Sequence, residues 1–371
     1  MQSQSTRRRS RPFLERLREL EDPWAREYLH ELERWLAAEP EPERARLARE
    51  LESEDVGKVD AAALELFLSD YFRSRSWSAK RHPPLEHTGR VPDFAIETGS
   101  TSLYAEAVLG QDAPAKQAQM KVWAALADEL DAVTGPFDVF VTPTGPWDGR
   151  FSRSKVRRSL EQQLREMEGQ ADVDQWTIEY TLDPHLPLQF EVTRVPDVGP
   201  VVGGWAPTGL VAQNVTTHET LYDRIDKKAA RYGELDRPYV VFVRAETEFP
   251  LRRFSIERAL YGTLRLHYGR GADERATLVG RSRSRDGIFT GRGAGGRPVR
   301  TRVSAVGVYR HFSDGRTINR HELVIYHNPN ARLALDPAVF ADVPQLTATN
   351  ADDGSTDYAW TAEPPEWAAE R

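Results

Sequence analysis

The sequence contains no cysteine, which excludes disulfide bonds, cysteine-ligated zinc, iron–sulfur clusters and thiol nucleophiles together. It has no HExxH motif or similarly spaced histidine pair, so a zinc hydrolase is not expected. It also lacks a run of about eighteen apolar residues, the length that would predict a membrane-spanning helix. The arginine-rich start of the chain is not followed by the apolar stretch of a signal peptide. We therefore expect a cytoplasmic protein with no membrane partner.

Positive charge is in deficit overall, with Lys+Arg 50 against Asp+Glu 57 and a formal net charge of −7. Such a chain is not expected to coat nucleic acid, because phosphate affinity needs local positive charge. Two segments, 150–158 and 281–302, are nonetheless strongly basic. Either run alone fits a solvated surface equally well. Together they predict phosphate contacts through Arg150, Arg153, Arg157, Arg281, Arg283, Arg285 and Arg292.

The hydrophobic pattern predicts a helical start followed by alternating helices and strands. A helix is expected from Ala61 to about Arg73, two strands near 94 and 104, and a helix over 220–232 that ends at Gly233. The segment Pro238–Val243 is almost continuously apolar, which is typical of a strand buried on both faces of a sheet. This order predicts the α/β class, with a mixed central sheet flanked by helices.

The same pattern gives a domain plan for the chain. We expect a disordered basic tail over 1–12, a helical N-terminal section over 13–58, one α/β domain over 59–345 with its core at about 60–243 and C-terminal strands with an Arg-rich loop over 244–345, and a loose acidic tail over 346–371.

Two carboxylates stand out among apolar neighbours. Asp93 opens the strand Phe94–Ile96 after a proline, and Glu106 lies inside the strand Ser102–Val108. A short polar turn joins the two strands, so both side chains can reach one pocket. Paired carboxylates hold hard cations such as Mg²⁺ or Mn²⁺ against a phosphate. A Pro-Asp turn and a solvent-facing Glu are the plainer explanation of each residue taken alone.

The motif resembles that of the PD-(D/E)xK nuclease superfamily, which has the restriction-endonuclease-like fold. The resemblance implies that Asp93 and Glu106 bind the metal, with the backbone carbonyl of Ala107 as a further ligand. It also implies that Glu65, on the preceding helix, is the additional acidic residue that many superfamily members carry there, and that it is a catalytic residue that assists in binding the metal. The sequence departs from the pattern at one position, because Val108 stands where the catalytic lysine is expected.

A lysine from another element is the predicted replacement. Lys228 and Tyr232 are spaced i,i+4 on the expected helix, so they share one face. Some superfamily members carry Gln and Tyr at this spacing, and others have moved the lysine onto a helix. We therefore predict Lys228 and Tyr232 as catalytic residues and Arg231 as a phosphate contact. Lys116 and Lys121 are alternatives for the lysine.

A wider resemblance covers most of the chain from about Ala61 to Phe340. The stretches 228–243, 286–289, 303–308 and 326–331 look like signatures of a family of mostly actinobacterial proteins with no assigned role. Together with the carboxylate motif, the resemblance implies a restriction-endonuclease-like core.

The sequence thus predicts a metal-dependent nuclease that hydrolyses phosphodiester bonds, with DNA as partner and a role in defence or genome maintenance. One alternative is a catalytically inactive nuclease-fold module that binds DNA or protein, which Val108 favours. Another is a structural α/β domain of a larger complex, with the aromatic N-terminal helices as a docking surface. A homodimer is compatible with the sequence, but nothing in it requires one.

Overall fold

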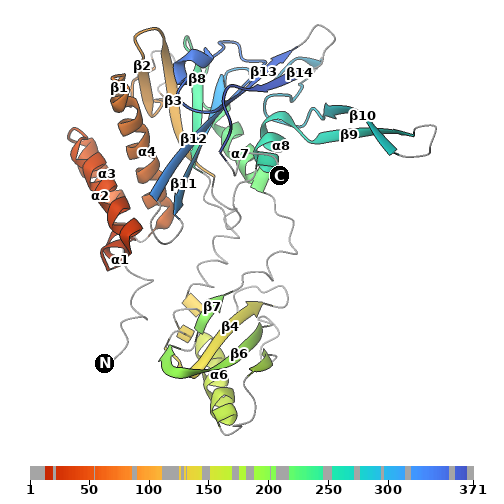
Figure 1. The fold of residues 1–371 in the computed structure, drawn as a ribbon. Helices are drawn as coiled ribbons and strands as arrows, with labels where there is room; N and C mark the ends of the chain where they lie inside the picture. Colours follow the sequence, from red (N-terminus) through yellow and green to blue (C-terminus); the bar gives the residue numbers. More distant parts are fainter. Residues whose placement is uncertain are drawn as a thin grey trace. The chain divides into compact units, whose positions relative to one another are not determined.

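The computed structural model divides into two compact units, and each is described by itself (Figure 1). The larger unit comprises Pro12–Asp112 and Thr216–Arg371, and the smaller holds the described residues of Ala113–Val215. The structure describes residues 13–19, 22–53, 55–85, 90–110, 125–126, 129–130, 132–143, 151–168, 175–180, 188–200, 202–205, 217–244, 253–270, 276–293, 296–313, 319–350 and 356–365. No helix in these ranges has both the length and the apolar character needed to cross a membrane.

An eight-stranded mixed sheet forms the centre of the larger unit, in the order β1-β2-β3-β8-β11-β12-β13-β14. Strand β3 pairs antiparallel with β2 and parallel with β8, so the pairing changes from antiparallel to parallel at this strand. The strands are β1 (Ser78–Arg81), β2 (Phe94–Glu97), β3 (Ser102–Leu109), β8 (Tyr239–Arg244), β11 (Ala305–Ser313), β12 (Asn319–His327), β13 (Gln345–Asn350) and β14 (Thr356–Trp360).

Helices cover both faces of this sheet. Helix α4 (Val56–Ser74), capped by the Asp55 side chain, packs Leu64, Leu68 and Phe72 on one face. Helices α7 (Thr217–Ala229) and α8 (Arg253–Tyr261) pack on the other. All six residues of β8 are buried between the two layers, as its apolar sequence predicts. The structure confirms the predicted α/β class with a mixed sheet flanked by helices.

Three N-terminal helices of the larger unit share a core with α4: α1 (Phe13–Glu19), α2 (Pro23–Ala37) and α3 (Glu43–Leu51). Buried Tyr28, Leu32 and Trp35 recur along one face of α2 at helical spacing. The Tyr28 ring stacks on His311 of β11 at 4.1 Å between centroids, and His321 of β12 bonds to Glu31 at 2.8 Å. These contacts join α2 to the end of the sheet.

The smaller unit has its own sheet and its own core. Its strands lie in the order β5-β6-β4-β7, and helix α6 (Arg153–Glu168) contributes buried Val156, Leu160 and Leu164 to a core shared with Phe190 of β6. The strands are β4 (Thr134–Pro143), β5 (Gln175–Tyr180), β6 (Leu188–Pro200) and β7 (Val202–Trp205). This division differs from the single domain predicted over 59–345, because alternating helices and strands do not reveal which strands pair.

The C-terminal part of the chain also differs from the prediction. Residues 346–371 were expected to form a loose tail, but β13 and β14 add an antiparallel pair to the sheet edge. Alternate residues of β14 account for this, because the Tyr358 ring packs on Tyr261 and the Trp360 ring on Tyr326. A separate two-stranded ribbon, β9 (Leu264–Arg270) with β10 (Ala276–Arg283), follows α8, and the short helix η3 (Pro337–Phe340) precedes β13. The predicted tail over 1–12 lies outside the described residues.

Candidate functional site

Strand alternation directs Glu106 toward helix α7. Leu103 and Ala105 of β3 belong to the core beneath α4, whereas Tyr104 and Val108 belong to the core beneath α7. Glu106 therefore faces α7, and its side chain is 0% exposed. Val108 faces the same way and is buried, so the position of the expected lysine is filled by an apolar side chain.

Lys228 in the last turn of α7 and two residues just after the helix, Arg231 and Tyr232, surround the Glu106 carboxylate. The Lys228 ammonium pairs with Oε1, and Arg231 Nη1 lies 3.1 Å from the same oxygen. The Tyr232 hydroxyl donates toward Oε2 and also lies 3.0 Å from the carbonyl oxygen of Val91. The structure thus brings together Glu106 and the helix residues predicted from the sequence.

The end of α7 explains how Tyr232 reaches the site. The predicted helix runs to Tyr232, but α7 ends at Ala229. The Arg231 amide then donates to the Lys228 carbonyl at 3.0 Å, which tightens the turn. This turn keeps Lys228 and Tyr232 on the same side, so both contact one carboxylate.

Asp93 lies at the open end of the β2–β3 pair. The pairing of β2 with β3 stops at Phe94 and Ala105, so the amide of Ala107 extends beyond the paired part of β2. Asp93 Oδ2 accepts a hydrogen bond from this amide at 2.8 Å. The Asp93 side chain therefore satisfies a backbone amide of β3 and also lies near Glu106.

The surroundings of Asp93 oppose its negative charge. Burial, and then the nearby charge of Glu106, raise the pKa of Asp93 to about 6, and Glu65 acts in the same direction. The Ala107 amide and the Lys228 ammonium lower this pKa but do not outweigh those effects. The half-buried Asp93 and the fully buried Glu106 repel each other, and a divalent cation placed between them would reduce that repulsion. Asp93 and Glu106 are therefore the two carboxylates here that could hold a metal such as Mg²⁺.

The number of carboxylates is also adequate for Mg²⁺. Among the residues that the structure describes, no group of three or more His, Asp or Glu side chains is arranged to hold a metal ion. Magnesium commonly uses one or two carboxylates and takes its other ligands from water and substrate phosphates. Asp93 and Glu106 together meet that requirement.

A second tyrosine, not recognised from the sequence, lies beneath the site. The Tyr239 ring of β8 packs edge-on against Tyr232, with 5.6 Å between centroids. Its hydroxyl is buried and has no hydrogen-bond partner among the described residues. Burial, followed by the charge of Glu106, raises the pKa of Tyr239 well above its usual value. Burial and a bond to Glu106 likewise raise the pKa of Tyr232. Both phenols therefore stay protonated at neutral pH.

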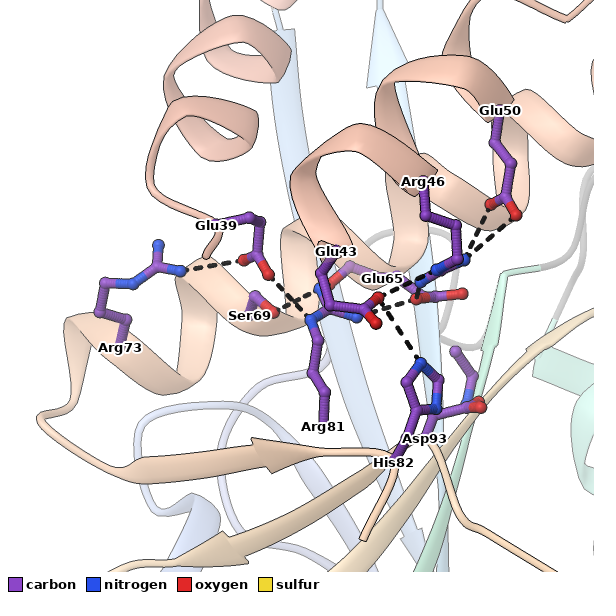
Figure 2. A network of polar contacts seen from close by, with 11 residues as sticks. Glu39, Glu43, Arg46, Glu50, Glu65, Ser69, Arg73, Arg81, His82 and Asp93 are labelled. Atoms are coloured by element: carbon purple, nitrogen blue, oxygen red, sulfur yellow. Dashed lines mark hydrogen bonds and ion pairs between the residues drawn. The ribbon is translucent and has the colours of Figure 1, made fainter. Parts of the chain in front are cut away.

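Glu65 is held in a separate ion-pair network (Figure 2). Its carboxylate accepts from Arg46 of α3 and from Arg81 of β1, the latter at 2.8 Å. Arg81 also binds Glu39 at 2.8 Å and Ser69 at 2.7 Å. The structure thus places Glu65 near enough to raise the pKa of Asp93, and both guanidinium groups bond to the same oxygen of its carboxylate, Oε2.

His82, not recognised from the sequence, links this network to Asp93. Its backbone amide donates to the Asp93 carbonyl at 3.0 Å, and its imidazole lies 3.6 Å from Glu43 (Figure 2). Its φ of 47° lies in the left-handed region, which is uncommon for a residue other than glycine. Nothing in the spacing of the motif marks this residue.

The predicted phosphate-binding arginines are placed differently from one another. Arg231 touches Glu106, with 43% of its side chain exposed. In the smaller unit, Arg153 is exposed, whereas Arg157 pairs with Glu129 at 2.8 Å and with Glu161. Arg150 lies outside the described residues, as do the alternative lysines Lys116 and Lys121.

The arginines of the C-terminal run also differ. Arg283 pairs with buried Glu257, whereas Arg285 and Arg292 are exposed. Arg281 lies on β10, opposite Leu266 of β9. Arg300, further along, pairs with Asp226 of α7 and so helps to hold the helix that carries Lys228.

Comparison with protein-family models, with curated proteins and with solved structures finds no match to this chain. The resemblance to the PD-(D/E)xK superfamily therefore stays a prediction.

Proposed function

We propose that this protein is a metal-dependent nuclease that hydrolyses phosphodiester bonds of DNA. The observation that carries the proposal is the convergence of Asp93, Glu106 and Lys228 from three different elements. One acid has a raised pKa, the second is fully buried, and a lysine contacts the second acid. An acid with a raised pKa beside a second acid and a lysine is typical of a functional site.

The order of the elements supports the same proposal. Helix α4 is followed by the antiparallel strands β1, β2 and β3, and then by α7 and the parallel strand β8. This order agrees with a restriction-endonuclease-like core. In this interpretation the smaller unit is an insertion between β3 and α7.

Each residue of the site has a distinct role in this proposal. Asp93 and Glu106 would bind Mg²⁺ or Mn²⁺, which when bound polarises the phosphate and lowers the pKa of a coordinated water. Lys228, with 24% of its side chain exposed, would donate a hydrogen bond to that water and so hold it in place. Arg231 is exposed enough to contact a phosphate oxygen while it lies beside Glu106. Tyr232 donates to Glu106 and fixes its orientation.

Glu65 has an indirect role in this account. Its bonds to Arg46 and Arg81 make it a partner in the bracing network, and its charge contributes to the raised pKa of Asp93. The metal ligands that we propose are therefore Asp93 and Glu106, without direct coordination by Glu65.

A plasmid and a single-stranded DNA, incubated with the purified protein and Mg²⁺ or Mn²⁺, test the proposal. We expect cleavage that Asp93→Asn abolishes. Glu97→Gln, at the far end of β2 with a 57% exposed side chain, is the matched control and should cleave normally. No cleavage by the wild type with either metal would contradict the proposal.

One observation favours a second candidate, an inactive nuclease-fold module that binds DNA or protein. Both oxygens of Glu106 are already engaged, by Lys228 and Arg231 on one side and by Tyr232 on the other. Under this alternative the carboxylate serves to dock α7 on the sheet. Under this alternative Mn²⁺ would not bind to the wild type, which calorimetric titration measures directly.

A further inference from the structure

The ribbon of β9 and β10 extends from the larger unit beyond α8 and pairs with no third strand among the described residues (Figure 1). Its strands are antiparallel, with Leu264 opposite Arg283 and Arg265 opposite Ser282. An isolated two-stranded ribbon is marginally stable in water. The ribbon therefore depends on its base for support, and neither of its edges pairs with another described strand.

The base of the ribbon is anchored by ion pairs. Glu257 of α8 is only 6% exposed, and it accepts from Arg253 of the same helix and from Arg283 of β10. Arg283 also donates to the Gly262 carbonyl at 3.1 Å, and its guanidinium lies 5.2 Å from the Tyr358 ring centre. Arg283 thus fixes the ribbon to the body of the unit instead of serving as a phosphate contact.

Polar contacts beside this anchor join the two chain segments at the base of the ribbon. The Thr263 amide donates to the Ser284 hydroxyl at 2.8 Å, and the Ser284 amide donates to the Thr263 carbonyl at 2.9 Å. The Asp286 carboxylate accepts from the Thr263 amide at 3.0 Å. The two strands therefore leave the base in a defined direction.

The charge of the ribbon is opposite to that of the protein. Residues 264–285 contain six arginines and two acids, in a chain whose formal net charge is −7. Arg265 on β9 and Arg285 just after β10 are both exposed. His267 is exposed as well and bonds to Ser282 across the ribbon at 2.7 Å. A narrow cationic element on an acidic body concentrates its attraction for polyanions in one place.

We propose that the β9–β10 ribbon enters the major groove of duplex DNA, with Arg265 and Arg285 on backbone phosphates. The choice of DNA among polyanions rests on the proposed nuclease function. The major groove of B-DNA, about 12 Å wide, admits a two-stranded ribbon. The major groove of duplex RNA is too narrow for side chains to read. The inference adds Arg265 to the predicted contacts and reassigns Arg283 to the anchor.

Fluorescence anisotropy of the full-length protein with labelled nucleic acids tests this inference, in EDTA so that no strand is cut. The probes are a duplex DNA, a duplex RNA of the same sequence and the single DNA strand. Arg265→Ala and Arg285→Ala are compared with Arg49→Ala on α3, which removes an exposed arginine that bonds to a carbonyl of its own helix. The affinity is measured from low to physiological salt.

We expect duplex DNA to bind more tightly than duplex RNA or the single strand. Each ribbon variant should reduce the slope of log affinity against log salt by about 0.9, and Arg49→Ala should leave it unchanged. Equal binding of all three probes, unchanged slopes in the ribbon variants or no binding of duplex DNA would overturn the inference. Cleavage of plasmid with Mg²⁺ is measured on the same preparations. Ribbon-dependent binding without cleavage would contradict the nuclease proposal alone. Cleavage without ribbon-dependent binding would contradict only the inference that the ribbon binds DNA.

Discussion

At the scale of single residues, the site is defined by an acid that the fold keeps from ionising easily. An ordinary aspartate has a pKa of 3.8, whereas burial and the charge of Glu106 raise the pKa of Asp93 to about 6. The folded state therefore binds the Asp93 proton more tightly than the unfolded state does. The contribution of this residue to stability is fully present below about pH 4 and is lost as the pH rises through about 6.

The raised pKa of Asp93 predicts how the stability of the metal-free protein changes when this residue is replaced. Asp93→Asn removes a charge that is unfavourable at neutral pH, while the amide oxygen can still accept from Ala107. In EDTA at pH 7.5 we expect the variant to be more stable than the wild type by about 1–3 kcal/mol. The gain should disappear near pH 4, where Asp93 is protonated in both states. Urea unfolding at the two pH values measures it, and a variant less stable than the wild type at pH 7.5 would contradict the raised pKa.

Addition of Mg²⁺ should reverse that order. The metal binds the ionised wild-type pair and stabilises it by mass action, but Asp93→Asn lacks one charged ligand. We expect Mg²⁺ to raise the melting temperature of the wild type and to leave that of Asp93→Asn nearly unchanged. The effect should grow as the pH rises through 6, since a proton on Asp93 competes with the metal. Equal shifts in both proteins would place the metal elsewhere.

At the scale of elements, the Arg81 network braces the site. Arg81 is 8% exposed and neutralises Glu39, whose side chain is 2% exposed, together with Glu65. Removal of one partner of a buried ion pair leaves an uncompensated charge, so Arg81→Ala should destabilise the protein by about 3–5 kcal/mol.

A pair on the surface provides the control for this prediction. Arg44 pairs with Glu41, and about half of each side chain is exposed, at 46% and 55%. Arg44→Ala should therefore change the stability by less than about 1 kcal/mol. Chemical denaturation of both variants measures the difference. Similar small effects at the two positions would show that the network does not brace the fold.

The elements also show what the sequence can and cannot predict. The apolar run of β8, the helical spacing of α2 and the Lys228–Tyr232 spacing are local signals, and each led to a correct element or contact. The prediction of a loose tail over 346–371 was wrong because Tyr358 and Trp360 pack on residues distant in sequence. The segment is acidic in composition, so the short alternating strand β14 was not recognised in it.

Some residues of the candidate site could be predicted from the sequence, and others could not. Asp93 and Glu106 could be paired from the sequence because only a short turn separates their strands. The engagement of Glu65 by Arg46 and Arg81 could not be predicted, since it depends on how α3 and β1 pack against α4. His82 and Tyr239 were missed for the same reason, because their positions follow from sheet register and not from a motif.

At the scale of the whole molecule, two units with separate cores should respond separately to damage. Leu160 of α6 and Leu260 of α8 are both fully buried, one in each unit. Each Leu→Ala change should cost its own unit about 2–5 kcal/mol through loss of burial and a cavity. Hydrogen exchange measured by mass spectrometry should show faster exchange in β4 and β6 for Leu160→Ala, and in β3 and β8 for Leu260→Ala. Faster exchange throughout both units in either variant would contradict their independence.

The most direct test of the central claim is single-turnover DNA cleavage with Mg²⁺ by the wild type, Lys228→Ala and Lys227→Ala. The two lysines are neighbours on α7, but Lys227 is exposed, whereas Lys228 contacts Glu106. If Lys228 replaces the lysine missing at Val108, its removal should lower the cleavage rate by about 10²–10⁴-fold, and removal of Lys227 should have little effect. Cleavage at the wild-type rate by Lys228→Ala, or equal losses in the two variants, would contradict the account.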